Sequence, residues 1–153
     1  MNKELRTLAE AIAGFIREDK GLQESGHVTV VVEDAADVEM AIRAAIGRLG
    51  VLVLVIVTGF DRRDNSGAVL FGTVRMEIRC YEHPSLNRDG TAWTAQHVME
   101  HLVKLLHWRV VPGLQTPMRF KNFARDDVQS ANIVRSQFVF DHVLGQNDEI
   151  TTE

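Results

Sequence analysis

The segment from His97 to His101 has the form H-x-x-E-H and is the strongest candidate for chemistry in the sequence. On a helix, histidines four residues apart lie on one face and could bind zinc, while Glu100 could activate a zinc-bound water. A third ligand is needed, and only 52 residues follow His101. One hypothesis is therefore a small zinc-dependent hydrolase that uses His97, Glu100 and His101. The other is that the two histidines flank the apolar stripe of a helix and bind no metal.

Other catalytic and cofactor-binding patterns are missing from the sequence. The single cysteine, Cys80, shares the apolar side of a predicted strand with Val74, Met76 and Ile78, which is typical of a small buried hydrophobe. The glycines form neither G-x-G-x-x-G nor a Walker loop. The sequence therefore predicts a non-enzymatic protein with no catalytic residue, no cofactor and no metal.

Charge and hydropathy narrow the class of protein further. The 17 basic and 21 acidic residues give a net charge of −4, and the segment 146–153 contributes three of the acids. The remainder is close to neutral, which disfavours a dedicated nucleic-acid binder. The longest apolar run, Val51–Val57, is too short for a membrane span of about 20 residues. A reducing, intracellular location without membrane contact is expected.

The periodicity of apolar residues predicts an α+β fold. Helices are expected over residues 3–19, 38–48 and 92–107, and strands over 27–32, 51–57, 69–82, 118–124 and 133–144. Loops are expected over 22–26 and 61–67, with a turn at Asp126-Asp127. This order predicts a single-layer mixed or antiparallel sheet of about five strands with helices packed on one face. Residues 1–145 would form one domain, and 146–153 a polar, flexible tail.

Two of the predicted strands suggest self-association. Val51–Val57 has no polar alternation, so we expect cover on both faces, by helices on one and by a neighbouring subunit on the other. The strand over 69–82 alternates apolar and polar residues and has Arg75, Glu77 and Arg79 on its polar face. The predicted contact between subunits therefore comprises these charged residues and two from the preceding loop: Arg62, Arg63, Arg75, Glu77 and Arg79.

The layout of the whole chain resembles the tail terminator and tail-completion proteins of tailed bacteriophages and prophages. The resemblance lies in the amphipathic helix Lys3–Asp19 and in the long strand Thr73–Glu82, which ends in Glu82-His83-Pro84. The loop Ser85–Gly90 then leads into a helix that begins Thr91-Ala92-Trp93-Thr94-Ala95. The strand Ile133–Phe140 ahead of a polar tail completes the match.

The resemblance implies a structural role and no chemistry. Such proteins have an α+β fold and assemble as rings, typically hexamers, that cap the tail tube, stop its polymerisation and present the head-joining surface. The implied partners are further copies of the chain, the tail tube protein and the head–tail connector protein, while DNA passes through the ring without specific binding. The implied location is the host cytoplasm during assembly and then the virion tail. The family has no catalytic motif whose residues could be transferred to this chain.

Overall fold

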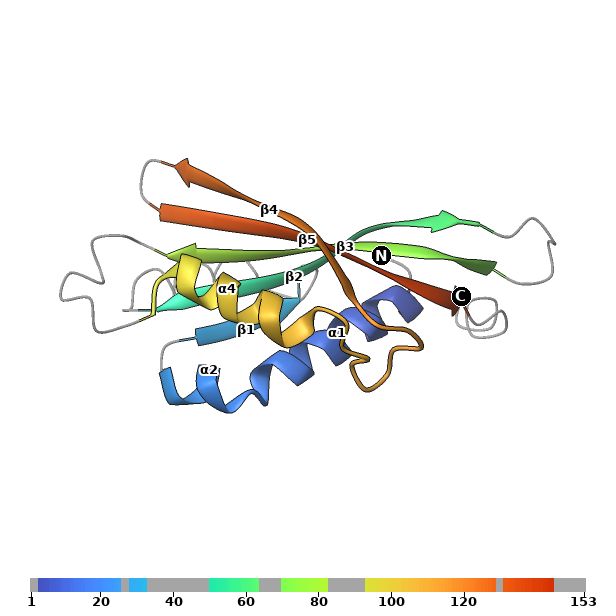
Figure 1. Ribbon diagram of the computed structural model, residues 1–153, viewed down its shortest axis with the longest axis horizontal. Helices are drawn as coiled ribbons and strands as arrows, with labels where there is room; N and C mark the ends of the chain where they lie inside the picture. The colour runs from blue at the N-terminus through green and yellow to red at the C-terminus, as the bar shows by residue number, and fades with distance from the viewer. Residues whose placement is uncertain are drawn as a thin grey trace.

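A five-stranded sheet forms one layer of the protein, and helices form the other (Figure 1). The computed structural model describes residues 3–25, 28–32, 50–63, 70–82, 93–128 and 131–144. The strands are β1 (Val28–Val32), β2 (Val51–Arg62), β3 (Leu70–Glu82), β4 (Arg119–Val128) and β5 (Ala131–Leu144), in the order β1-β2-β3-β5-β4. Strand β1 is parallel to β2, and the other pairs are antiparallel. The predicted α+β fold with a mixed sheet is confirmed.

The described helices are α1 (Lys3–Arg17), α2 (Lys20–Ser25) and α4 (Ala95–Leu106). Helix α1 packs on β1 and β2, and α4 packs on β3, β4 and β5. Both helices place apolar residues at spacings of three and four, so one stripe of each enters a common core. The predicted helix over 38–48 and the tail 146–153 lie outside the described residues.

Strand β3 alternates as the sequence predicts. Its residues Val74, Met76, Ile78 and Cys80 are buried beneath the helices, while the residues between them lie on the opposite, outer face of the sheet. Strand β2 is different, because Leu52, Leu54 and Ile56 on its outer face are only 0%, 3% and 5% exposed. Cover on both faces of β2 is thus achieved within one chain. The expectation that a neighbouring subunit supplies the second cover is wrong.

Three local predictions are also wrong. Of the loop expected over 22–26, the described residues 22–25 belong instead to helix α2, because the Asp19 carboxylate accepts a hydrogen bond from Leu22 N at 3.0 Å and caps the helix. Asp61 and Arg62 belong to β2, which a bulge between Val57 and Gly59 carries past the apolar run. Asp126 and Asp127 lie in β4, opposite Ile133 and Asn132, rather than in a turn. Pairing with the neighbouring strand overrides the local turn preference in both strands.

The sheet is much longer than the helices that cover it. At about 3.3 Å per residue, the 13 residues of β3 span about 43 Å, whereas the 12 residues of α4 span about 18 Å. Strands β2, β3 and β5 therefore continue past the helices, on the right of Figure 1. We call this end of the sheet the strand arm (residues 58–63, 70–75 and 139–144); its inner side still contributes Val74, Phe140 and Leu144 to the core. None of the helices in the described part of the chain is long and apolar enough to cross a membrane.

Candidate functional site

Helix α4 places the H-x-x-E-H residues in three different environments. His97 is exposed and stacks on Trp93 at a ring distance of 4.1 Å. His101 Nε2 lies 2.7 Å from Asp19 Oδ2, and its ring meets the edge of Trp93. Glu100 accepts a hydrogen bond from Gln96 Nε2 at 2.9 Å. The two histidines therefore share a helix face, as predicted, but Glu100 has a different neighbour.

A metal site would need a further ligand near these histidines. No group of three His, Cys, Asp or Glu side chains suited to a metal occurs within the described ranges. The contacts of His101 already have a structural explanation, because Asp19 also caps α2. The Asp19–His101 hydrogen bond thus links the start of α2 to α4, and the geometry offers little support for zinc chemistry.

Cys80 lies in the core and is fully buried. Burial raises the pKa of its thiol above the usual range, because an apolar environment disfavours the thiolate. The thiol therefore lacks the properties of a nucleophile, in line with the prediction of a small buried hydrophobe.

Three of the five predicted interface residues lie on the outer face of the sheet and form ion pairs within the chain. Arg75 Nε lies 2.7 Å from Asp61 Oδ2, and Arg79 pairs with Glu77. The Tyr81 hydroxyl, followed by the Glu77 carboxylate, raises the pKa of Arg79 above its usual range although burial opposes the shift. These side chains form a strip of mixed charge.

The remaining two predicted residues lie at the end of β2. Arg62 is exposed and pairs in register with Gly72. Arg63, just after the strand, donates to Asp141 Oδ1 at 2.9 Å, and its guanidinium lies 5.5 Å from the centre of the Phe71 ring. The structure thus brings Arg62, Arg63 and Arg75 to the strand arm, while Glu77 and Arg79 lie nearer the middle of the sheet.

Asp141, which the sequence analysis missed, is the centre of this polar surface. Its carboxylate accepts hydrogen bonds from Thr73, Arg63 and Arg119. Burial raises the pKa of Asp141, but the bonds from Arg119 and Thr73 and the positive charges outweigh it and leave the pKa below its ordinary value. Only strand register reveals the cluster, because the partners lie 22 to 78 residues away in sequence.

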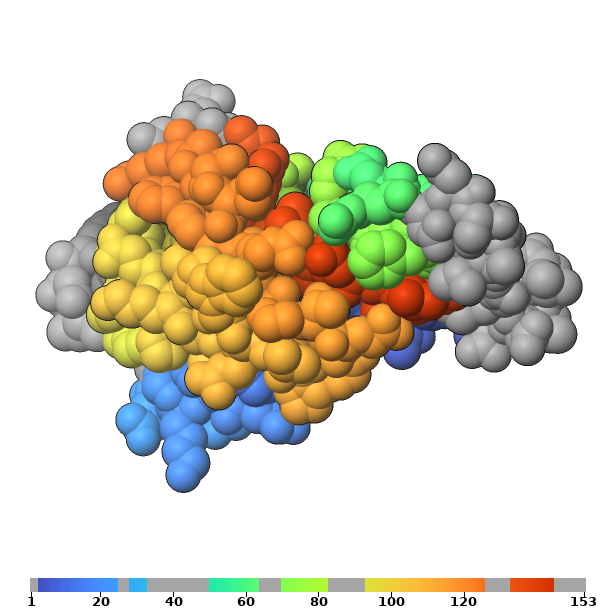
Figure 2. Space-filling view, turned by 45° about the vertical axis from the view of Figure 1, so that its right-hand side comes forward, coloured from blue at the N-terminus to red at the C-terminus, as the bar shows by residue number. Residues whose placement is uncertain are grey.

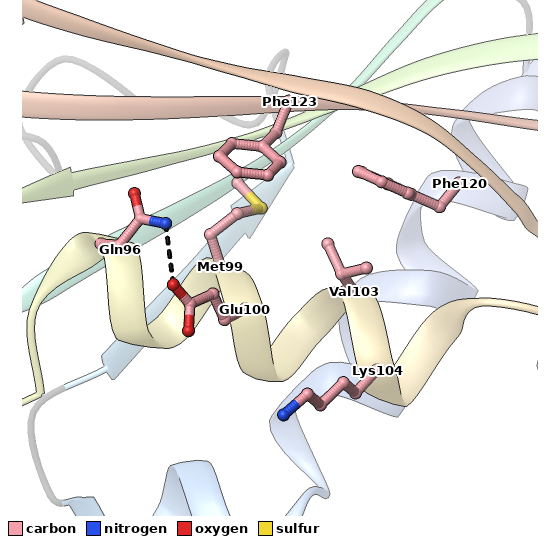
Figure 3. Close-up of a pocket in the computed structure, with 7 residues that line it drawn as sticks. All are labelled: Gln96, Met99, Glu100, Val103, Lys104, Phe120 and Phe123. Atoms are coloured by element: carbon pink, nitrogen blue, oxygen red, sulfur yellow. Dashed lines mark hydrogen bonds between the residues drawn. The ribbon is translucent and has the colours of Figure 1, made fainter.

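A groove between α4 and β4 is a second feature that the sequence analysis missed (Figure 3). It has a volume of about 350 Å³. Its apolar walls are Met99 and Val103 on α4 and Phe120 and Phe123 on β4, and its rim is formed by Gln96, Glu100 and Lys104. The polar residues recur every four positions along α4, a spacing that the sequence contains but that is also typical of any solvated helix face.

The segment after α4 presents further apolar side chains to solvent. Trp108 is 63% exposed and Val110 is 49% exposed. Figure 2 shows α4, the segment 107–118 and β4 together on one face of the molecule. The groove and the segment that carries Trp108 therefore lie on the same face, and an exposed apolar patch of this kind is typical of a protein contact surface.

Comparison with known proteins leaves the family open. No protein-family model matches the chain, and no curated protein matches its sequence. Any assignment therefore depends on the geometry described above and on the resemblance in layout.

Proposed function

We propose that the protein is a non-enzymatic morphogenesis component of a tailed phage or prophage, a tail terminator that forms a ring on the tail tube. In this role the ring caps the tube, stops its growth and presents the head-joining surface. The protein would act in the host cytoplasm during assembly and then remain in the virion tail. Its size, its α+β fold and its resemblance in layout to that family support the proposal.

The observation that carries the proposal is the strand arm. Strands β2, β3 and β5 run past the described helices at this end of the sheet (Figure 1), and although Phe140, His142 and Leu144 are buried on the inner side, the outer face of the arm is not covered by any of the described helices. Val143 on the arm is 37% exposed, beside Phe71 in register. A ring requires one surface of a subunit to contact a different surface of the next, and a projecting arm suits such a head-to-tail contact.

The charges on the outer face fit the same role. The ion pairs Asp61–Arg75 and Asp141–Arg63 place acidic and basic side chains next to each other on the arm. Paired charges of mixed sign favour a particular register between subunits more than they add affinity. A surface of this kind in the lumen of a ring would also let DNA pass without holding it.

The test begins with the neighbouring genes, which should encode tube, tape-measure and connector proteins. The purified chain should then bind the ends of tubes formed by the neighbouring tube protein and limit their length in electron micrographs. Arg75→Glu and Arg79→Glu should weaken assembly without changing the circular dichroism spectrum. A metabolic operon around the gene, or tubes that grow unchanged in the presence of the chain, would overturn the proposal.

Metal analysis distinguishes the proposed tail terminator from the rival function, a zinc hydrolase that uses His97, Glu100 and His101. We expect purified protein to contain no stoichiometric zinc, because Asp19 occupies His101 Nε2. One equivalent of zinc that disappears in His97→Ala would favour the hydrolase over the terminator.

A further inference from the structure

The backbone at Trp108 holds the indole away from the core. Trp108 has φ = 61°, the one positive value among the non-glycine residues that the structure describes. A bulky residue in this region carries strain, and such strain persists only where neighbouring contacts enforce it. Trp108 N donates to Met118 O at 2.7 Å, and Met118 N donates to Arg109 O at 3.0 Å. A strained backbone that exposes a tryptophan indicates a contact surface.

The exposed tryptophan lies next to the α4–β4 groove. Phe120, which lines the groove, donates its backbone N–H to His107 Nδ1 at 3.1 Å, and His107 directly precedes Trp108. The ring of His107 also meets that of Trp108 at 5.5 Å. Because the exposed Trp108 and the groove adjoin each other on one face, a second copy related by a two-fold axis can bury the tryptophan and fill the groove in a single contact.

We propose that two copies of the chain pair through antiparallel packing of their α4 helices, with Trp108 of each copy inserted into the groove of the other. With the axis at the level of Leu102, Gln96 faces Trp108 of the second copy, and Glu100 faces Lys104 of the second copy. Each Trp108 then reaches the end of the groove formed by Gln96, Met99 and Phe123.

Charge complementarity supports this register. Glu100 and Lys104 are one helical turn apart on the groove rim and both are exposed. Two parallel copies would place like charges together, whereas the antiparallel register pairs Glu100 of each copy with Lys104 of the other and gives two ion pairs. The same residues therefore favour one orientation of the pair and disfavour the other.

The area of the patch predicts a weak pair. A fully covered large side chain buries about 150–250 Å², so the exposed parts of Trp108, Val110 and Phe123 contribute roughly 300 Å² per copy. The total of roughly 600 Å² is below the roughly 1,200 Å² of a stable specific interface. Pairing should therefore depend on concentration. A two-fold contact closes after two copies, so this contact differs from the one that would form a ring. The proposal of pairing therefore does not depend on the proposed phage role.

Sedimentation equilibrium of the full chain at low salt, up to roughly 1 mM, tests the pairing. We expect a monomer–dimer equilibrium whose dissociation constant rises at least tenfold in Trp108→Ser, because a tryptophan anchor dominates a small interface. Val143→Ser, which removes an exposed apolar side chain on the strand arm, is the matched control and should change the constant less than twofold. Circular dichroism confirms that each variant is folded.

Charge reversal tests the register itself. Glu100→Lys places lysines opposite each other at both ends of the helix pair and should weaken the dimer at least threefold, whereas the double variant Glu100→Lys/Lys104→Glu should restore it. A chain that stays monomeric, or association that Trp108→Ser leaves unchanged, overturns the pairing. Loss in the single variant without recovery in the double variant overturns the antiparallel register.

Discussion

His142 Nε2 lies 2.7 Å from Glu4 Oε2, so a hydrogen bond joins the last strand to the first helix across 138 residues of sequence. The His142 side chain is 4% exposed, and its Nδ1 is buried without a hydrogen-bond partner among the described residues. A proton on Nδ1 would be a buried donor with no acceptor, which costs more than a buried lone pair. The structure therefore places the donated proton on Nε2, where Glu4 accepts it.

Removing the acceptor of this bond should destabilise the protein. Glu4→Ala leaves the Nε2–H group of His142 buried and unpaired, so the free energy of unfolding should fall by about 1–3 kcal/mol. Glu4→Gln keeps an acceptor oxygen and should stay within about 0.5 kcal/mol of the wild type. Urea unfolding at pH 7 measures both variants, and ¹⁵N chemical shifts of the His142 ring report its tautomer. Equal losses in the two variants would contradict the assignment.

The sequence was sufficient to predict the class of fold and most of the strands. Alternation in residues 73–80 identifies which side of β3 enters the core, and the apolar run Val51–Val57 correctly indicates a strand covered on both faces. It could not reveal that β2 continues to Arg62, because polar residues after a glycine resemble a loop until the register with β3 is known. Strand ends depend on the partner strand more than on local composition.

The candidate surfaces were harder to predict than the fold. The groove combines Met99 and Val103 with Phe120 and Phe123, and only the packing of α4 beside the edge strand brings them together. The two histidines of the H-x-x-E-H segment do share a helix face, but their partners Trp93 and Asp19 come from other parts of the chain. Short-range spacing specifies a helix face, whereas long-range contacts determine what that face does.

The burial of Cys80 predicts an unreactive thiol. Its side chain is fully buried, and the raised pKa keeps it protonated at neutral pH. Ellman's reagent should label the native protein only through unfolding, whereas the protein in guanidinium chloride should react at once. Labelling at similar rates in both conditions would show that this part of the core opens readily.

Two glycines should respond to alanine in opposite directions. A Cβ at Gly72 would overlap the carbonyl oxygen of Asp61 and lie 2.9 Å from Arg62 Cα, so β2 and β3 would have to separate. A Cβ at Gly14 in α1 would meet nothing within 4 Å beyond its own helix backbone. We expect Gly72→Ala to lower the midpoint of thermal unfolding by several degrees, with a cost of about 1–3 kcal/mol from overpacking. Gly14→Ala should raise stability by about 0.5–1 kcal/mol, because alanine favours the helix. A stabilising Gly72→Ala would contradict the close contact of the two strands.

The Asp141 cluster predicts how stability changes with acid. Its pKa is lowered in the folded protein from an ordinary value of 3.8, so the folded state releases this proton more readily than the unfolded chain. The resulting stabilisation is present above that value and is lost as the pH falls through the lower, folded one. Because Arg63 and Arg119 are partly exposed, Asp141→Asn should cost about 1 kcal/mol at pH 7, less than a fully buried pair. The difference from wild type should shrink as the pH falls from about 5 to about 2 in chemical unfolding experiments.

Asp61→Asn, which breaks the more exposed pair with Arg75, is the control and should change stability by less than about 0.5 kcal/mol. If Asp141→Asn and Asp61→Asn changed the free energy of unfolding equally at every pH, the prediction that the Asp141 cluster stabilises the folded state more than an exposed ion pair would be wrong.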